Sequence, residues 1–244
     1  MNEITVEERV RYDRQILIEG WGEEGQLRLK QARVFVAGAG GLGGPVSIYL
    51  AVAGVGGLVI CDADHVELSN LNRQILHTTE RIGEFKAHSA AQTLGALNPD
   101  IQVSTTTDYL DEQSVERLVG HPDVVVDCLD NFETRYLLNR YCLTRGIPFV
   151  HGAVRGLLGQ TTFIASPATP CLRCIFPEAP PKEKFPVVGA TPGIVGAIQA
   201  LEVLKHLTGV GKTLRGTLLM FEGDEMEFTR IVVKRREDCP DCGG

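Results

Sequence analysis

A glycine-rich turn, with the charged residues that follow it, is the part of this 244-residue sequence best suited to chemistry. The turn contains Gly38, Gly40, Gly41 and Gly43. It follows the apolar run 33–37 and leads into a helix-like stretch at 45–53. Glycines let a backbone approach phosphates closely, and the N-terminus of the next helix offers free N–H groups and a positive potential. We therefore expect this strand–turn–helix unit to bind a nucleotide.

A second apolar run, 58–61, ends directly at Asp62. This position lies about 20 residues beyond the glycines, where a carboxylate can accept hydrogen bonds from a ribose. Asp64 competes for that role, and Asp62 could instead cap the end of the strand. We favour Asp62 as the ribose ligand because it follows the strand immediately.

Two cations, Arg73 and Lys86, follow Asp62 in the sequence. A dinucleotide carries two phosphates, for which the glycine turn largely suffices. Two further cations near one phosphate site favour a triphosphate, and hence ATP over NAD. Most lysines and arginines are solvated surface residues, and spacing alone leaves that alternative open for Arg73, Lys86 and Arg14.

Asp130 and Asn131 end an apolar run that begins at Asp123. Asp130 is thus expected at the carboxyl end of a central strand, where open α/β sheets bind their ligands. A carboxylate that faces a triphosphate needs a cation between them, so we expect Asp130 to hold Mg²⁺. The alternative is a turn-forming Asp-Asn pair. Asp127 is expected to be buried and structural, or to support the site indirectly.

Four of the seven cysteines form two Cys-x-x-Cys pairs, Cys171 with Cys174 and Cys239 with Cys242. Each pair can donate two thiolates, and two pairs complete the tetrahedral shell of a structural Zn²⁺. A redox role for either pair is the alternative. The remaining cysteines lie in or beside apolar runs and are expected to be small core residues. They are Cys61, Cys128 and Cys142.

Strand and helix patterns alternate up to Val150, which predicts an α/β fold with a doubly wound, Rossmann-like, mostly parallel sheet. Strands are expected at 33–37, 58–61, 101–105, 123–128 and 147–150, and helices at 44–53, 84–97, 111–119 and 132–145. Two helices, over 7–20 and 22–30, are expected before the first strand. The first should bury a face made of Val10, Ile16, Leu17 and Ile18.

The pattern changes after Val150. A strand is expected at 159–165, followed by a proline-rich stretch. The last helix should start with Thr191 as N-cap and Pro192 at its first position, and should end at Gly209. An antiparallel hairpin at 218–222 and 227–233 completes the prediction.

The composition, with 43% hydrophobic and 23% charged residues, is that of an ordinary globular protein. A net charge of −7 argues against a nucleic-acid binder. The acidic N-terminus has no apolar segment typical of a secretory signal, and no apolar run approaches the roughly 18 residues of a membrane span. We therefore expect a cytoplasmic protein that binds neither nucleic acid nor membrane. Its six histidines show no pairing pattern and are expected to be structural or peripheral.

Taken together and in order, these motifs resemble the MoeB/ThiF/HesA family, the bacterial relatives of ubiquitin-activating enzymes. The motifs are Arg14-Gln15 after a tyrosine, the glycine turn, a Ser-Asn-Leu-Asn-Arg-Gln segment with Ser69, Asn70, Asn72 and Arg73, then Lys86, Cys-Leu-Asp-Asn at 128–131, and the two cysteine pairs. The resemblance runs from about Arg11 to Cys242, and as a set the motifs are highly specific.

The resemblance implies an adenylyltransferase that uses ATP and Mg²⁺ to activate a ubiquitin-like sulfur-carrier protein with a Gly-Gly C-terminus. The carrier's terminal carboxylate would attack the α-phosphate of ATP and form an acyl-adenylate. The family's nucleotide site maps onto the glycine turn, Asp62, Ser69, Asn70, Asn72, Arg73, Lys86, Asp130 and Asn131. Arg14 would reach the γ-phosphate bound by a partner subunit, which implies a homodimer.

We expect one domain over 1–244, with N-terminal helices at 1–32, a nucleotide-binding half at 33–150 and a carrier-binding half with the zinc site at 151–244. Some relatives of the ThiF type carry a cysteine in the loop after the first cysteine pair, and the loop at 175–186 has none. The enzyme is thus expected to stop at the acyl-adenylate and to leave sulfur to a separate donor. This favours a MoeB-type over a ThiF-type enzyme, while the pathway it serves, for molybdopterin, thiamin or another thiolated product, stays open.

Two other functions remain open from the sequence. An NAD-dependent oxidoreductase would use the same glycines and Asp62 but leaves Arg73, Lys86 and the cysteine pairs unexplained. The other possible function is that of a non-catalytic module that binds ATP or a carrier protein. The chain's own Gly243-Gly244 end follows Cys242 at once, and we expect it to be too short to enter an active site.

Overall fold

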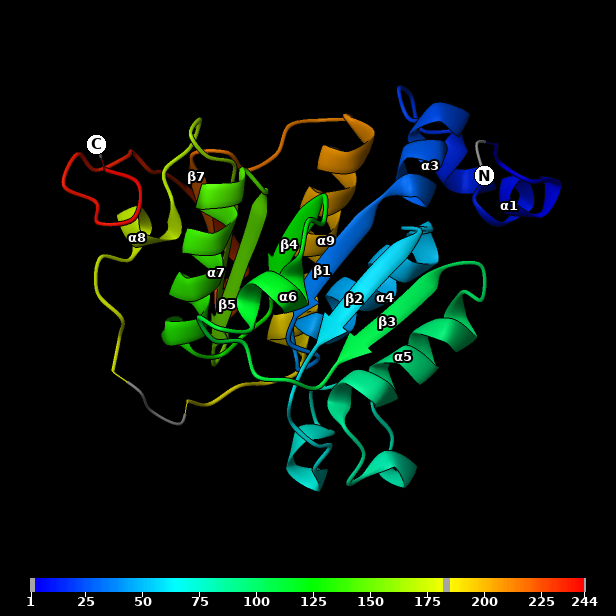
Figure 1. The fold of residues 1–244 in the computed structure, drawn as a ribbon, viewed down its shortest axis with the longest axis horizontal. Coiled ribbons are helices and arrows are strands. Elements are labelled where there is room, and N and C mark those ends of the chain that lie inside the picture. The colour runs from blue at the N-terminus through cyan, green and yellow to red at the C-terminus, as the bar shows by residue number, and fades with distance from the viewer. Residues whose placement is uncertain (1–2, 182–184, 244) are drawn as a thin grey trace.

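A mixed sheet forms the centre of the computed structural model, which describes residues 3–181 and 185–243. Its eight strands follow the order β3-β2-β1-β4-β5-β6-β7-β8 (Figure 1). The first five pair in parallel: β1 (Arg33–Ala37), β2 (Gly57–Cys61), β3 (Gln102–Thr106), β4 (Val124–Asp127) and β5 (Phe149–Arg155). The last three continue the sheet antiparallel: β6 (Leu158–Ile164), β7 (Thr217–Glu222) and β8 (Glu227–Val232). The predicted mostly parallel sheet with a C-terminal hairpin is confirmed.

Helices cover both faces of the parallel strands. One layer contains α3 (Gly22–Gln31), α4 (Gly43–Ala53), α5 (Lys86–Leu97) and α9 (Ala190–Thr208). The other contains α6 (Val115–Val119), α7 (Phe132–Arg145) and the short α8 (Leu172–Ile175). In Figure 1, α6 and α7 lie in front of the sheet, and α4 and α9 lie behind it.

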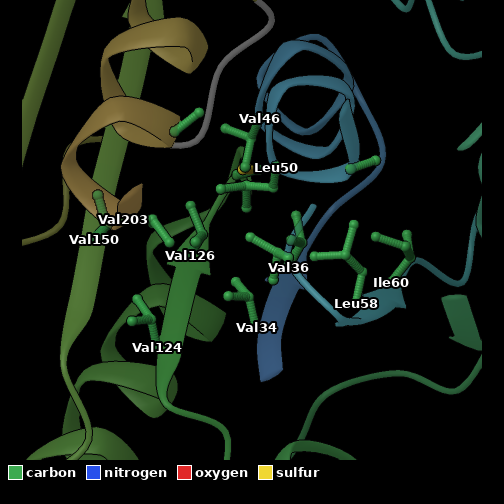
Figure 2. Close-up of a cluster of buried hydrophobic side chains, with 14 of the residues drawn as sticks. Val34, Val36, Val46, Leu50, Leu58, Ile60, Val124, Val126, Val150 and Val203 are labelled. Atoms are coloured by element: carbon green, nitrogen blue, oxygen red, sulfur yellow. The ribbon is translucent and has the colours of Figure 1, made fainter. Parts of the chain in front are cut away.

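Successive residues of each central strand enter opposite layers because side chains alternate across a strand. Val34 and Val36 of β1 pack with Val46 and Leu50 of α4, as Figure 2 shows, whereas Phe35 belongs to the cluster on the α7 side. All five side chains are fully buried. Burial of each contributes about 1.5–3 kcal/mol, so the strand and turn geometry is fixed by the core on both faces.

The strand order places a topological switch point between β1 and β4. β2 and β3 lie on one side of β1, while β4 and β5 lie on the other. Ligands of open α/β sheets bind outside the carboxyl ends of strands at such a point. The residues that follow β1 and β4 are the glycine turn and the segment 128–131, so the fold brings these two motifs to one crevice.

The region before the sheet differs from the prediction. Instead of one helix over 7–20, the chain forms α1 (Val6–Arg11) and α2 (Asp13–Ile16), with a break at Tyr12. The break changes the helical register, so Val10 and Leu17 are 75% and 70% exposed and the predicted buried face is wrong. Tyr12 is buried instead, and its hydroxyl accepts a hydrogen bond from Asn98 Nδ2 at 2.9 Å.

Three helix starts also differ. The last helix begins at Ala190 with Gly189 as N-cap, so Thr191 is no cap; its hydroxyl donates to the Gly156 carbonyl at 3.0 Å. α5 begins at Lys86 and not at 84. α6 begins only at Val115, because the Asp111 carboxylate accepts from the next backbone N–H groups and holds a turn there. None of the helices in the described part of the chain is long and apolar enough to cross a bilayer.

Candidate functional site: a glycine turn, its charged neighbours and a four-cysteine cluster

In the glycine turn, backbone segments lie so close together that a side chain would not fit between them. Gly38 has φ of +100°, and a Cβ there would lie 2.7 Å from the Cys128 carbonyl oxygen. A Cβ at Gly43 would lie 1.9 Å from the Gly38 carbonyl oxygen. Both positions therefore require glycine for packing within the crossing of β1, β4 and α4. Gly40 and Gly41 leave more space, so they are the positions where the turn is open to a ligand.

Asp62 is attached to this turn. Its Oδ2 accepts a hydrogen bond from Ala39 N at 2.7 Å, and its Oδ1 accepts from Asp64 N at 3.0 Å. Burial raises the pKa of the Asp62 carboxyl, while the Lys86 charge and these N–H groups act in the opposite direction. The arrangement holds a partly buried carboxylate beside the glycines, as the ribose hypothesis requires.

Lys86 is the first residue of α5, and its side chain is only 9% exposed. Its Nζ lies 2.8 Å from Asp64 Oδ2, and its backbone N–H donates to the Asp64 carbonyl. Asp64, the competing ribose candidate, is thus engaged by Lys86. An ammonium with three donors can keep this partner and still bind an anion, so a buried cation is available next to the turn.

The segment 69–74 folds against the glycine turn and the start of α9. A Cβ on Gly41 would lie 3.7 Å from Arg73 Cγ and 3.3 Å from Pro192 Cγ. Arg73 Nη1 donates to the Ser69 carbonyl at 3.0 Å and to Asn72 Oδ1 at 2.8 Å. Asn70 is buried, and its Oδ1 accepts from Glu67 N. Asn70, Ser69 and Asn72 therefore shape the segment that presents Arg73 to the turn.

Asp130 and Asn131 lie across the switch point, in the segment after β4. Asn131 is the N-cap of α7, because its Oδ1 accepts from Thr134 N at 2.9 Å. Asp130 is exposed, and within the described residues it makes no hydrogen bond or ion pair. An exposed carboxylate without a protein partner, at the edge of the crevice, can serve as an oxygen ligand for Mg²⁺.

Arg14 is not brought to these residues within one chain. It is an exposed residue of α2, and its neighbour Gln15 donates to the Ala53 carbonyl at the far end of α4. The glycine turn is at the opposite end of that 11-residue helix, a separation of about 16 Å.

The four paired cysteines converge as predicted. All four Sγ atoms lie within 4.8 Å of one another. Cys171 Sγ is 3.9 Å from Cys174 Sγ and 3.6 Å from Cys239 Sγ, and Cys174 Sγ is 3.4 Å from Cys242 Sγ. Four sulfurs at about 2.3 Å from one Zn²⁺ would be about 3.8 Å apart, so the cluster has the dimensions of a closed zinc site.

The three other cysteines are core residues, as expected. Cys61, Cys128 and Cys142 are all buried. Burial raises the pKa of Cys61 to about 12 and also raises the pKa values of Cys128 and Cys142. None of these thiols is a ready nucleophile at neutral pH.

A family model, described as the ThiF family, matches residues 12–241 of this chain. The chain belongs to the ThiF family. A SAMP-activating enzyme E1 from Haloferax volcanii is 47% identical over 96% of this chain and 88% of its own length. A sulfur carrier protein adenylyltransferase from Thermus thermophilus is 44% identical over 98% of this chain and 92% of its length.

Two further similarities concern the extent of the family fold. Mouse adenylyltransferase and sulfurtransferase MOCS3 is 45% identical over 98% of this chain, which spans about half (54%) of that protein. A crystal structure of E. coli MccB with ATP has a TM-score of 0.87 at 23% identity, over 96% of this chain and 75% of that one. This likeness shows that the ThiF fold is shared.

Two residues beside the glycine turn were not predicted from the sequence. Gln74 is buried, its Nε2 lies 3.5 Å from a Cβ placed on Gly40, and its Oε1 has no hydrogen-bond partner among the described residues. His77 Nε2 is 3.0 Å from the Ala39 carbonyl, and its Nδ1 is 2.9 Å from Ser89 Oγ. Gln74 lies in the same motif as Arg73, which was the available signal; the contacts of His77 have no local signal.

His151 is a buried histidine, in agreement with the expected structural role, but it has a partner that the sequence pattern did not indicate. Its Nδ1 lies 2.7 Å from Asp127 Oδ2, and both side chains are fully buried. Burial lowers the pKa of His151, and the Asp127 carboxylate only partly compensates. The expectation that Asp127 is buried is confirmed, whereas its indirect support of the site stays a prediction.

Proposed function

We propose that this chain is an ATP-dependent adenylyltransferase that forms an acyl-adenylate on the C-terminal glycine of a ubiquitin-like sulfur-carrier protein. The observation that carries the proposal is the gathering of Arg73, Lys86, Asp62 and Asp130 around one glycine turn. Its full-length relatives include an enzyme named for sulfur-carrier adenylylation. An NAD-dependent oxidoreductase leaves the buried Lys86 and the cysteine cluster without a purpose.

The reaction joins two anions, the carrier's carboxylate and ATP, and the charged residues of the site can reduce the repulsion between them. A carboxylate oxygen of the carrier attacks the α-phosphorus of ATP, and the bond to the bridging oxygen of pyrophosphate breaks. Pyrophosphate leaves with that electron pair. The attacking carboxylate is already ionised, so no general base is needed. Arg73 and Lys86 neutralise phosphate charge as the two anions approach, Asp62 holds the ribose, and Gly40 and Gly41 leave room for the phosphates.

Asp130 is the residue proposed to hold Mg²⁺, with Asn131 next to it at the start of α7. The ion would supply charge neutralisation at the phosphates. Cys171, Cys174, Cys239 and Cys242 would hold Zn²⁺, whose four protein ligands leave no open position, so its role is structural. The carboxylate and thiolate donor sets match the preferences of these two metals.

We assign Arg14 to the site of a second copy of this chain. Arg14 lies far from the glycine turn of its own chain, and it is close in sequence to Val10 and Leu17, which are exposed. Apolar side chains beside an arginine are typical of an interface. In a homodimer, Arg14 would complete the partner's triphosphate site.

Sulfur is proposed to come from a separate donor. The buried thiols with raised pKa values are poor nucleophiles, and the four cluster thiols would be occupied by zinc. The loop at 175–186, of which 182–184 lie outside the described residues, contains no cysteine. Gly244 also lies outside them, so the expectation for the chain's own Gly-Gly end stays a prediction.

Carrier-dependent ATP–pyrophosphate exchange tests the proposal, with a panel of small Gly-Gly-ended proteins as substrates. Wild-type protein should exchange label only when a matching carrier is present. Lys86→Ala and Asp130→Asn should each lower the exchange rate by about 10²–10³-fold, the usual cost of removing one stabilising charge. Lys234→Ala, at an exposed site, is the control and should keep the wild-type rate. Exchange without a carrier, or none with any carrier, would contradict the function.

Mixing two inactive variants tests the shared site. If Arg14 acts across a dimer, Arg14→Ala mixed with Lys86→Ala restores one intact site in each mixed dimer. An equal mixture should then recover about a quarter of the wild-type exchange rate. No recovery after subunit exchange, monitored by native mass spectrometry, would place Arg14 outside the partner's site.

A further inference from the structure

A buried charged network lies directly beneath the segment that carries Asp130. Asp127, the last residue of β4, is fully buried. Its Oδ2 lies 2.7 Å from His151 Nδ1 and 3.3 Å from Arg135 Nε. The Arg135 side chain, from the second turn of α7, is 5% exposed. The network is therefore shielded from bulk solvent, and its three members come from β4, β5 and α7.

The hydrogen bonds of this network converge on Leu129. Its N–H donates to Asp127 Oδ1 at 3.0 Å, and its carbonyl accepts from Arg135 Nη2. Arg135 Nη2 also donates to the Gly152 carbonyl at 3.1 Å, which ties the segment to β5. Both polar groups of the residue before Asp130 are thus bonded to one buried ion pair.

Asp130 itself has no such anchor. Within the described residues its carboxylate makes no hydrogen bond or ion pair, so its position depends on the backbone on either side. Asn131 fixes the following side by capping α7, and the Asp127–Arg135 pair fixes the preceding side through Leu129. The exposed carboxylate is therefore oriented by groups that never reach the crevice.

Burying a charge pair is costly, and apolar residues of similar size often stabilise a fold as well or better. Packing alone therefore gives little reason for a charged pair at this position. The guanidinium of Arg135 reaches Asp127, Leu129 and Gly152 at once, and it also lies 5.0 Å from the centre of the Phe132 ring. A lysine has one donor atom and cannot reproduce this planar fork.

We propose that Arg135, paired with Asp127, is a positioning residue that fixes Asp130 to face the metal-bound triphosphate. This inference rests on the proposed function, since it assigns Asp130 to the metal. It adds a second layer to the site: Arg135 acts through the backbone of Leu129 and touches neither nucleotide nor carrier.

The test measures Mn²⁺ binding, by electron paramagnetic resonance, to protein saturated with a non-hydrolysable ATP analogue. Arg135→Lys and Arg135→Gln should weaken Mn²⁺ binding by about 10–100-fold, the usual effect of removing the support of a metal ligand. The matched control is Arg140→Gln, on the same helix, where the side chain is 40% exposed and forms an ion pair with Glu112 on the surface. It should bind Mn²⁺ as the wild type does.

A double-mutant cycle separates positioning from a general structural role. If Arg135 acts through Asp130, Asp130→Asn with Arg135→Lys should bind Mn²⁺ no more weakly than Asp130→Asn alone. Additive losses would overturn the proposal, as would wild-type Mn²⁺ affinity in a folded Arg135→Lys protein. Arg135→Lys keeps the charge that Asp127 needs, so it remains informative if Arg135→Gln fails to fold.

This measurement needs no carrier, so its outcome is distinct from that of the proposed function. Normal Mn²⁺ behaviour without any carrier-dependent exchange would overturn the adenylation of a carrier and leave the positioning role in place. A wild-type protein that binds the nucleotide but no Mn²⁺ would overturn the role of Asp130, and this inference with it.

Discussion

The glycine turn and the cysteine cluster are both polar centres, but different forces hold them in place. Ala37 and Ala39, on either side of Gly38, are fully buried, and the Gly38 N–H donates to the Cys61 carbonyl at 2.8 Å. Between 233 and 243, by contrast, Cys239 is the sole buried residue of those described. The turn is thus fixed by the core of the sheet, whereas the C-terminal segment depends on its thiols and a few polar contacts.

The comparison shows that two parts of one chain can be stabilised by different interactions. Around the turn, apolar burial fixes the backbone, and the polar groups are free to bind a ligand. Around the cluster, a metal would replace the core that the segment lacks, as in small metal-stabilised domains. Perturbing one centre should therefore leave the other intact.

Removal of the metal should give the largest effect, because it should disorder the cysteine cluster and leave the glycine turn unchanged. Apparent binding free energies of structural zinc are on the order of 10–16 kcal/mol, and little apolar burial would remain to hold residues 233–243. After treatment with a strong chelator, or in Cys174→Ser, a protease should cut this segment, while ATP binding by calorimetry stays unchanged. Cys142→Ala, a buried cysteine outside the cluster, should keep one zinc per chain. Loss of ATP binding together with zinc would show that the two centres are coupled.

Gly43→Ala should damage the other centre. The new Cβ would lie 1.9 Å from the Gly38 carbonyl oxygen, so the backbone of the turn must move. We expect the free energy of unfolding to fall by roughly 1–3 kcal/mol and ATP binding to weaken, with zinc content unchanged. Gly95→Ala is the control: it lies in α5, a Cβ there meets nothing within 4 Å, and the change should stabilise the helix by about 0.5–1 kcal/mol. Equal ATP affinity in the two variants would contradict the role of the turn.

The sequence predicted the features whose signals are local. The glycine turn, the alternating strands and each Cys-x-x-Cys pair depend on residues a few positions apart, and their predicted structures are confirmed. The two cysteine pairs are distant in the sequence, and their meeting was predicted because one zinc ion needs four ligands. The predicted helix over 7–20 was wrong because apolar spacing does not reveal a break at Tyr12. Helical periodicity also cannot distinguish a face buried in the core from one available to another chain.

Long-range polar contacts were not predictable in the same way. His151 and Asp127 are 24 positions apart, and no sequence motif contains both of them. They meet because β4 and β5 pair in parallel with Asp127 opposite His151, a register that no local pattern specifies. Thr191 was assigned as a cap from its neighbour Pro192, but its hydroxyl is engaged by the Gly156 carbonyl instead.

The pH dependence of stability should reveal the buried histidine. Because the folded-state pKa of His151 is lowered from 6.5, the unfolded state binds more protons below that pH. Its contribution to stability is therefore complete above pH 6.5 and is lost as the pH falls towards the lower folded pKa. His151→Gln should reduce the slope of unfolding free energy with pH below pH 6.5 by up to about 1.4 kcal/mol per pH unit. Urea titrations measure this, and His121→Gln, at an exposed site, should leave the slope as it is. An unchanged slope in His151→Gln would mean that the pKa of this histidine is the same in the folded and the unfolded protein.

The smallest effect is expected where the two centres are joined through α7. Asn139, which is buried, accepts from Leu172 N at 2.9 Å and donates to Asp241 Oδ2 at 2.8 Å, so it connects both cysteine pairs to the helix that begins after Asp130. Asp241→Ala should cost about 1 kcal/mol, the usual worth of one hydrogen bond, and should speed protease cleavage of 233–243 without a change in ATP affinity. Asp238→Ala, which removes an exposed pair with Arg236, should do neither. A fall in ATP affinity in Asp241→Ala would show that α7 transmits strain from the cysteine cluster to the nucleotide crevice, and the two centres would then have to be treated as one.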